Sequence, residues 1–332
     1  MKVSIIGGGT WGTAFAIHLG RLKIETQLWI REKEVYEEML HYRENRTFLP
    51  GYVFPPEVSF FHDIKDALSS AETVFIAVPS KFCRKIFEQI APHLSSQHMV
   101  VSLTKGIEEG SLKTMSEVME EVFSPSFIPQ IAVLSGPSFA KEVAESHPTA
   151  VVLASRELNQ AKKIQHSISS PVFRTYTSDD ITGVELAGAV KNVIAIAAGI
   201  SDSLQFGSNS VAALVTRGIA EMIRLGVKLG ARQETFAGLA GIGDLVLTCT
   251  GKLSRNHYVG LELGKGKSLG EIVSSMKMVA EGITTTLSVH QLAKREKIEM
   301  PICEQVFQVL YKNKNPKKAL ENLMSRKLKS EY

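Results

Sequence analysis

The sequence predicts an α/β N-terminal domain with a doubly wound parallel sheet, followed by an all-α C-terminal domain. A strand-like run at residues 3–6 leads through the glycine-rich stretch GGGTWG at 7–12 into an apolar helical pattern at 13–17. Short runs rich in β-branched residues then recur, mostly separated by segments long enough for helices, which is typical of a parallel sheet with crossover helices. From about residue 180 the strand signal fades and long helical patterns take over.

The spacing of apolar residues, together with prolines and glycines that interrupt helices, predicts the individual helices and strands. After the first helix, residues 25–30 read as a second strand, and the charged stretch 32–44 has helical character until Pro50 and Gly51 interrupt it. Later strands are predicted at 73–78, 99–103, 131–134 and 150–153, and long helices at 184–200, 211–229 and 284–295. The changeover near residues 178–180 gives two domains, at residues 1–180 and 181–332.

Composition and charge narrow the class of protein. Of 332 residues, 44% are hydrophobic and 22% charged, which is typical of a globular protein. The 38 basic and 34 acidic residues are spread along the chain, so the formal charge of +4 favours anionic substrates but gives no nucleic-acid-binding patch. The N-terminus lacks a signal-peptide pattern and no uninterrupted apolar run reaches transmembrane length, so we expect no stable membrane insertion.

The cysteines and histidines predict no metal site. Cys83, Cys249 and Cys303 are odd in number, far apart and without a Cys-x-x-Cys pair, which argues against a disulfide framework and a zinc site. The nine histidines include no His-x-x-x-His pair, so neither a metal ligand set nor a nucleophile–base triad is predicted. A reducing, cytoplasmic location fits this pattern best.

The GGGTWG stretch predicts a dinucleotide site. Gly7 permits the tight turn out of the strand, Gly9 lets the backbone approach a pyrophosphate, and Gly12 lets the helix pack against the strand. The phosphates would then lie on unpaired amides at the helix N-terminus. We therefore interpret residues 1–180 as a dinucleotide-binding Rossmann-type domain and residues 181–332 as a helical substrate-binding domain.

Arg31 favours NADP as the cofactor. In NAD-preferring domains an acidic residue about 20 residues past the glycines binds the ribose hydroxyls. Here Arg31 stands at that place, and its guanidinium is suited to a 2′-phosphate. Glu32 beside it leaves NAD possible, with Arg31 merely solvating a loop.

Lys191 is the anomalous residue of an otherwise apolar helix, and this makes it a candidate proton donor. Burial lowers the pKa of an ammonium group, so that it can donate and accept a proton during carbonyl and alcohol interconversion. Asn192 next to it is a candidate hydrogen-bonding partner. The alternative is a lysine whose stem lies on apolar surface while its head reaches solvent.

Two strand ends offer further ligand groups. Lys105 stands after the strand ending at residue 103, at the carboxyl edge where doubly wound sheets bind ligands. The stretch SGPSFA at 135–140 also follows a strand, with Ser135 as a possible N-cap and Pro137 suited to a first helical turn, so that amides stay free for a substrate. A mere capping loop is the alternative.

Two segments of the helical domain add candidate substrate ligands. Asp244 follows glycines in AGIGD and could orient a hydroxyl or a lysine, although the segment could also be only a turn. Ser254, Arg255 and Asn256 begin a helical stretch in which a cap serine, a guanidinium and free amides make a phosphate cradle. Arg255 as an ordinary exposed arginine is the alternative.

Taken together, these motifs resemble the bacterial type of NAD(P)-dependent glycerol-3-phosphate dehydrogenase. The matching pieces run in family order: GGGTWGTA at 7–14, VPS at 78–80, TKGIE at 104–108, SGPSFA at 135–140, AGAVKNVIAIAAG at 187–199, AGIGDLVLTCTG at 240–251 and SRN at 254–256. The resemblance implies reversible reduction of dihydroxyacetone phosphate to sn-glycerol 3-phosphate for glycerophospholipid synthesis, and, by analogy, a possible homodimer.

The resemblance also implies roles for single residues. It assigns proton transfer to Lys191 and makes the following residues substrate contacts together with Lys191: Lys105, Gly136, Ser138, Asp244, Ser254, Arg255 and Asn256. Around the cofactor, beside the three glycines, it places Thr10, Trp11, Arg31, Lys105, Ala140, Arg255, Val279 and Glu281. Phe48 stands where relatives often have Tyr, which removes a phenolic hydroxyl.

Two other functions compete with this interpretation. One is another reductase of the same architecture, such as a β-hydroxyacid or ketopantoate-type dehydrogenase. The other is a protein that binds the nucleotide without turnover, although the polar set of Lys191, Lys105 and Asp244 argues against it.

Overall fold

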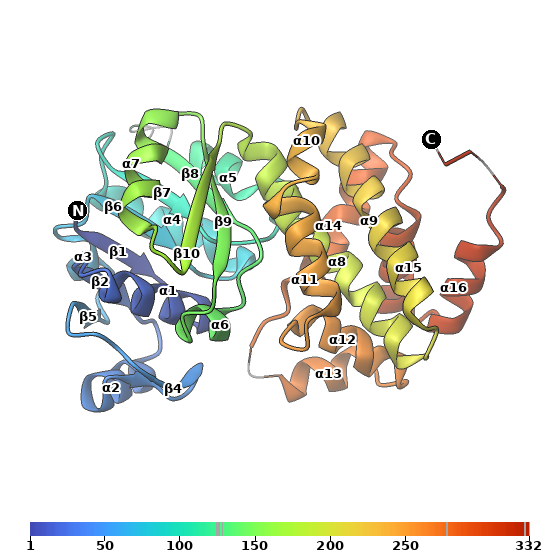
Figure 1. The fold of residues 1–332 in the computed structure, drawn as a ribbon, viewed down its shortest axis with the longest axis horizontal. Helices are drawn as coiled ribbons and strands as arrows, with labels where there is room; N and C mark the ends of the chain where they lie inside the picture. Colours follow the sequence, from blue (N-terminus) through green and yellow to red (C-terminus); the bar gives the residue numbers. More distant parts are fainter. Residues whose placement is uncertain (124–126, 128, 277, 329, 332) are drawn as a thin grey trace.

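The computed structural model describes residues 1–123, 127, 129–276, 278–328 and 330–331. An eight-stranded sheet with helices on both faces forms the N-terminal half, and a bundle of helices forms the C-terminal half (Figure 1). This arrangement confirms the predicted fold class.

The sheet has the strand order β10-β9-β8-β7-β6-β1-β2-β5. Its strands are β1 (Val3–Ile6), β2 (Thr26–Trp29), β5 (Val58–Phe61), β6 (Thr73–Ile76), β7 (Met99–Ser102), β8 (Gln130–Ser135), β9 (Thr149–Ser155) and β10 (Phe173–Ser178). A separate hairpin pairs β3 (Glu44–Asn45) with β4 (Leu49–Val53). The helices of this half are α1 (Thr10–Arg21), α2 (Lys33–Tyr42), α3 (Ile64–Leu68), α4 (Ser80–Ile90), α5 (Met115–Phe123), α6 (Ala140–Ala144) and α7 (Leu158–Ile168), with a 3-10 turn at Ala91–His93.

One pairing departs from the predicted parallel sheet. β9 runs antiparallel to β8, with Ala132 opposite Ser155, whereas the other neighbouring strands of the sheet are parallel. The helix between them, α6, has 5 residues. Such a helix spans about 8 Å, whereas a six-residue strand spans about 20 Å, so α6 is too short to return the chain for a parallel crossover.

The sequence analysis missed the two edge strands, β5 and β10. The sequence of β10, FRTYTS, alternates buried and exposed residues over its first half, and β5 is a four-residue VSFF with an exposed serine. Neither strand has the continuous apolar run that marks a strand buried on both faces.

α8 (Ile181–Ser203) is the core of the helical half and packs against α9 (Ser208–Lys228), α11 (Asp244–Thr250), α12 (Arg255–Gly264), α14 (Glu281–Glu296) and α15 (Pro301–Lys312). The remaining helices are α10 (Gln233–Phe236), a π-helical turn at Leu239–Gly243, α13 (Leu269–Ser275) and α16 (Pro316–Met324). α8 is long and apolar enough to cross a membrane, but 94% of its apolar window is buried inside the protein. Its apolar character is therefore that of a bundle core.

The change from sheet to bundle lies close to the predicted boundary. The last strand, β10, ends at Ser178, and α8 begins at Ile181 with the Asp180 carboxylate accepting the Gly183 amide at 2.9 Å. We keep the division between residues 180 and 181 as a proposal.

Two glycines let α8 and α12 cross in backbone contact. A Cβ added at Gly199 of α8 would lie 2.0 Å from the His257 carbonyl oxygen, and one added at Gly260 of α12 would lie 2.1 Å from the Ile196 carbonyl oxygen. The crossing fixes the position of α12, whose first residues carry the predicted phosphate cradle.

Gly199→Ala is expected to lower the free energy of unfolding by about 1–3 kcal/mol, because the new methyl group would overpack the crossing. The midpoint of urea unfolding measures this loss. Gly270→Ala on α13 is the matched control, because an added Cβ there meets nothing within 4 Å. An unchanged midpoint for the Gly199 variant would contradict the close crossing.

Candidate active site

The glycine loop between β1 and α1 fits a pyrophosphate. Gly7 has a φ of +122°, which glycine adopts without strain. A Cβ at Gly12 would lie 1.9 Å from the Gly7 carbonyl oxygen, whereas one at Gly9 would meet nothing within 4 Å. No described side chain caps α1, so its first amides are available to phosphate oxygens. Each glycine thus has the geometry that the fingerprint predicts, and the loop fits a dinucleotide.

Residues before α14 lie against this loop. Thr10 Oγ1 lies 2.8 Å from Met278 Sδ and 3.2 Å from the Phe48 carbonyl oxygen, to which it donates. Val279 follows Met278 in the chain, and Trp11 follows Thr10. The structure therefore brings Thr10 of the glycine loop against Met278, the residue before the predicted cofactor residue Val279.

Glu281 connects α14 to the carboxyl edge of the sheet. Its carboxylate accepts the Ser80 amide at 2.9 Å and the Ser80 hydroxyl at 2.6 Å, at the start of α4. Burial raises the pKa of Glu281, although the Ser80 hydrogen bonds oppose the shift. A Cβ at Gly106 would lie 2.9 Å from Glu281 Oε2, so the chain after Lys105 also passes closely here.

Arg31 and Glu32 lie together after β2. Arg31 is exposed, its Nε donates to Glu32 Oε1 at 2.9 Å, and its guanidinium carbon lies 5.2 Å from the centroid of the Phe82 ring. Arg31 and Glu32, the two residues considered for cofactor selection, therefore lie side by side at the carboxyl end of β2.

Lys191, Lys105 and Asp244 form one ion cluster. Lys191 Nζ donates to Asp244 Oδ1 at 2.7 Å, and Lys105 Nζ donates to Asp244 Oδ2 at 2.7 Å. Lys105 Nζ also donates to the Gly136 carbonyl oxygen at 2.9 Å. Lys191 is 5% exposed and Asp244 is 1% exposed, so the alternative of a lysine head reaching solvent is wrong.

The pKa values of Lys191 and Asp244 are both below their ordinary values, for different reasons. Burial is the main cause that lowers the pKa of Lys191 to about 8, and the Asp244 charge partly offsets it. Burial alone would raise the pKa of Asp244, but the charges and hydrogen bonds of Lys105 and Lys191 outweigh it and hold this pKa below its ordinary value. The site thus combines a stable carboxylate with an amine that can exchange a proton near neutral pH.

Thr248 is a site residue that the sequence analysis missed. Its hydroxyl oxygen accepts Lys191 Nζ at 2.7 Å and donates to the Asp244 carbonyl oxygen at 2.6 Å. Its spacing of four residues from Asp244 on a helix, which puts both side chains on one face, was the available signal.

Asn192 contacts the cluster by a different route from the one predicted. Its Nδ2 donates to the Lys105 carbonyl oxygen at 3.2 Å, and its Oδ1 accepts Asn256 Nδ2 at 2.8 Å. Asn256 Oδ1 in turn accepts the Gly282 amide at 2.9 Å. Adjacent residues on a helix point in different directions, so the Asn192 side chain does not follow that of Lys191. It binds the backbone at Lys105 instead.

The predicted phosphate cradle forms the start of α12. Ser254 is the N-cap, and its hydroxyl oxygen accepts the His257 amide at 3.1 Å. Arg255 is the first helical residue and is exposed, while Asn256 is buried. A guanidinium at a helix N-terminus is suited to an anion.

The prediction for the loop after β8 was wrong in part. Ser135 is the last residue of β8 rather than an N-cap, because Gly136, with a φ of +133°, turns the chain and delays α6 until Ala140. Pro137 lies outside the helix for the same reason. Ser138 Oγ donates to the Gly136 carbonyl oxygen at 2.9 Å, the oxygen that also accepts Lys105, so this loop borders the ion cluster.

Among the described residues, no group of three or more histidine, cysteine or acidic side chains gathers as metal ligands.

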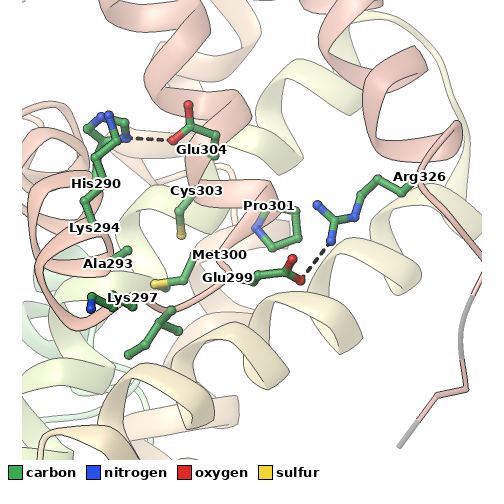
Figure 2. A pocket seen from close by; sticks show the side chains of 11 residues that line it. His290, Ala293, Lys294, Lys297, Glu299, Met300, Pro301, Cys303, Glu304 and Arg326 are labelled. Atoms are coloured by element: carbon green, nitrogen blue, oxygen red, sulfur yellow. Dashed lines mark hydrogen bonds and ion pairs between the residues drawn. The ribbon is translucent and has the colours of Figure 1, made fainter.

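A separate cavity of about 350 Å³ lies where α14 meets α15 (Figure 2). Two pairs of its lining side chains interact, His290 with Glu304 at 2.7 Å and Arg326 with Glu299 at 3.1 Å. None of the residues that line this cavity belongs to the Asp244 cluster.

Comparison with known proteins identifies the family. The family description "NAD-dependent glycerol-3-phosphate dehydrogenase N-terminus" matches residues 2–161, and "NAD-dependent glycerol-3-phosphate dehydrogenase C-terminus" matches residues 180–321. The chain is 49% identical to glycerol-3-phosphate dehydrogenase [NAD(P)+] of Citrifermentans bemidjiense, over 99% of this chain and 98% of that protein. It is 50% identical to the Koribacter versatilis enzyme of the same name, over 98% and 97% of the two chains.

A solved structure agrees with these relatives. The crystal structure of glycerol-3-phosphate dehydrogenase from Coxiella burnetii is 40% identical in sequence and superposes with a TM-score of 0.94, covering 98% of this chain and 99% of that one. Family, fold and length thus agree, and the chain belongs to the NAD-dependent glycerol-3-phosphate dehydrogenase family, whose members are NAD(P)-dependent oxidoreductases.

Proposed function

We propose that this enzyme reversibly reduces dihydroxyacetone phosphate to sn-glycerol 3-phosphate, with NADPH favoured over NADH. The observation that carries the proposal is the sheltered Lys191 ammonium, 2.7 Å from Asp244 Oδ1 and 2.7 Å from Thr248 Oγ1. A ketone that gains a hydride at carbon must gain a proton at oxygen, and Lys191 is the group that supplies it. A bound nicotinamide would supply the hydride to C2 of the substrate.

Lys105 and Asp244 are proposed to position the substrate oxygen and to tune Lys191. Two ammonium groups share one carboxylate, so the protonated cluster carries a net charge of +1. This charge favours an oxygen that becomes negative during hydride transfer. When Lys191 gives up its proton, the cluster becomes neutral, which allows the amine to be reprotonated for the next turnover.

Arg255 is proposed to anchor the phosphate, with Ser254, Asn256, Gly136 and Ser138 completing the substrate pocket. Arg255 begins α12, so its guanidinium and the positive end of the helix act on the same anion. Binding energy at the remote phosphate then orients the reacting carbon toward Lys191.

The dinucleotide is proposed to contact the glycine loop and the residues that the family resemblance implies, Thr10, Trp11, Ala140, Val279 and Glu281 among them. Arg31 would bind the 2′-phosphate of NADP, while Glu32 keeps use of NAD possible. No resident metal is needed for hydride transfer. We further propose that the enzyme is cytoplasmic, forms a homodimer and supplies the glycerol phosphate backbone of phospholipids.

Lys191→Met removes the amine while keeping an apolar chain of similar length, and it is expected to lower kcat by about 100- to 10,000-fold, because the proton donor is lost. Steady-state assays at the nicotinamide absorbance band measure this. Arg255→Ala is the matched comparison: it should mainly raise the KM for dihydroxyacetone phosphate. Near-normal kcat in a folded Lys191→Met enzyme would contradict proton transfer by this residue.

The pH profile should follow the Lys191 pKa of about 8. Ketone reduction needs the ammonium form, so kcat for reduction should fall as the pH rises through about 8, while alcohol oxidation should rise over the same range. In Asp244→Asn the negative charge that raises the pKa of Lys191 is lost, so the falling limb should move to lower pH. A limb that stays at the same pH would assign it to another group.

Arg31→Asp should raise the KM for NADPH by about tenfold or more and leave that for NADH nearly unchanged, because a carboxylate repels the 2′-phosphate. Parallel assays with both reduced cofactors test this. Glu32→Gln is the control and should affect NADH more than NADPH. An unchanged KM for NADPH in Arg31→Asp would show that Arg31 does not select the cofactor.

A further inference from the structure

We propose that Asn45 is a positioning residue for the dinucleotide: it holds the Gly8–Gly9 peptide so that the Gly9 N–H points at the pyrophosphate. The proposal rests on the use of a nicotinamide dinucleotide and is independent of which ketone is reduced. Asn45 lies in the β3–β4 hairpin, outside the glycine fingerprint and outside the residues assigned above.

Asn45 is fully buried, and its amide group is fully engaged at the glycine loop. Its Nδ2 donates to the Gly8 carbonyl oxygen at 2.8 Å and to Thr13 Oγ1 at 2.7 Å, while its Oδ1 accepts the Phe48 amide at 3.0 Å. The two donated bonds span the turn from the loop into α1. A buried amide with this many partners holds one orientation.

The orientation of the Gly8 carbonyl determines that of the next amide. In a trans peptide the carbonyl and the following N–H point in opposite directions. Asn45 draws the Gly8 carbonyl into the interior, so the Gly9 N–H must face outward, and no described residue accepts it. The space beside Gly9 is also open, since an added Cβ at this residue would meet nothing within 4 Å. A glycine pair has few steric restraints of its own, so an external group is needed to keep this peptide from rotating.

The hairpin is itself anchored, so Asn45 acts from a fixed support. Arg43 Nη2 donates to the Pro55 and Val58 carbonyl oxygens at 2.6 and 2.9 Å. On the other strand, Tyr52 Oη donates to Glu145 Oε1 at 2.6 Å, next to α6. These contacts connect the hairpin to the sheet and to the loop after α6 independently of Asn45.

The test compares two ligands in Asn45→Asp, Asn45→Ala and the wild type. Asp keeps the size and the acceptor for the Phe48 amide but loses both donors. ADP-ribose contains the pyrophosphate and 2′-AMP does not, and both are measured as competitive inhibitors against NADPH. Gln165→Ala is the control, because Gln165 Nε2 donates to the Thr175 carbonyl oxygen at 2.7 Å in a comparable bond far from the loop. Urea unfolding accompanies each variant.

ADP-ribose should bind Asn45→Asp about tenfold or more weakly than the wild type, as expected for loss of one aligned hydrogen bond to a charged group. The inhibition constant of 2′-AMP and kcat at saturating NADPH should stay near the wild-type values, and Gln165→Ala should affect stability alone. Unchanged ADP-ribose binding in Asn45→Asp, or an equal loss for both ligands, would overturn the proposal. Failure of the wild type to bind either ligand would instead overturn the cofactor assignment.

Discussion

The Asp244 carboxylate, buried between two ammonium groups, makes the interaction on which the candidate active site depends. One oxygen accepts Lys191 from the central helix and the other accepts Lys105 from the loop after β7, so a single side chain connects the bundle to the sheet. Removing one partner of a buried ion pair generally costs about 3–5 kcal/mol, because the remaining charge is left uncompensated. The charged state of these three side chains therefore depends on the correct packing of the two halves against each other.

Helix N-termini are a second source of positive potential in the protein, besides the lysines. They differ in whether a side chain already binds their first amides. α4 has its first amide bound by Glu281, and α12 has an amide bound by the Ser254 hydroxyl. α1 begins at Thr10 after the N-cap Gly9 and has no side-chain cap from the described residues, so its first amides are available to a ligand. In α12 the Ser254 hydroxyl occupies one of the free amides, and the guanidinium of Arg255, the first helical residue, adds a positive charge at the same helix end. A diphosphate and a monophosphate can thus be bound at two separate helix ends.

Local patterns predicted those parts of the fold that depend on neighbouring residues. The central strands, α1 and α8 appeared as predicted, because a buried strand and a buried helix each need continuous apolar sequence. The edge strands β5 and β10 escaped prediction because one of their sides meets solvent or polar groups. The N-cap proposed for Ser135 failed because Gly136, rather than the serine, determines where the chain turns.

The sequence by itself determined the fold class, the glycine fingerprint and the place of Lys191 in an apolar helix, since each depends on contiguous residues. Tertiary structure alone decided that Lys105, Lys191 and Thr248 converge on one carboxylate, that β9 reverses direction, and that Asn45 lies against Gly8. These contacts join residues far apart in the chain or depend on which helix face is buried. Their distances are set by packing of the sheet, hairpin and bundle, and no local pattern encodes that packing.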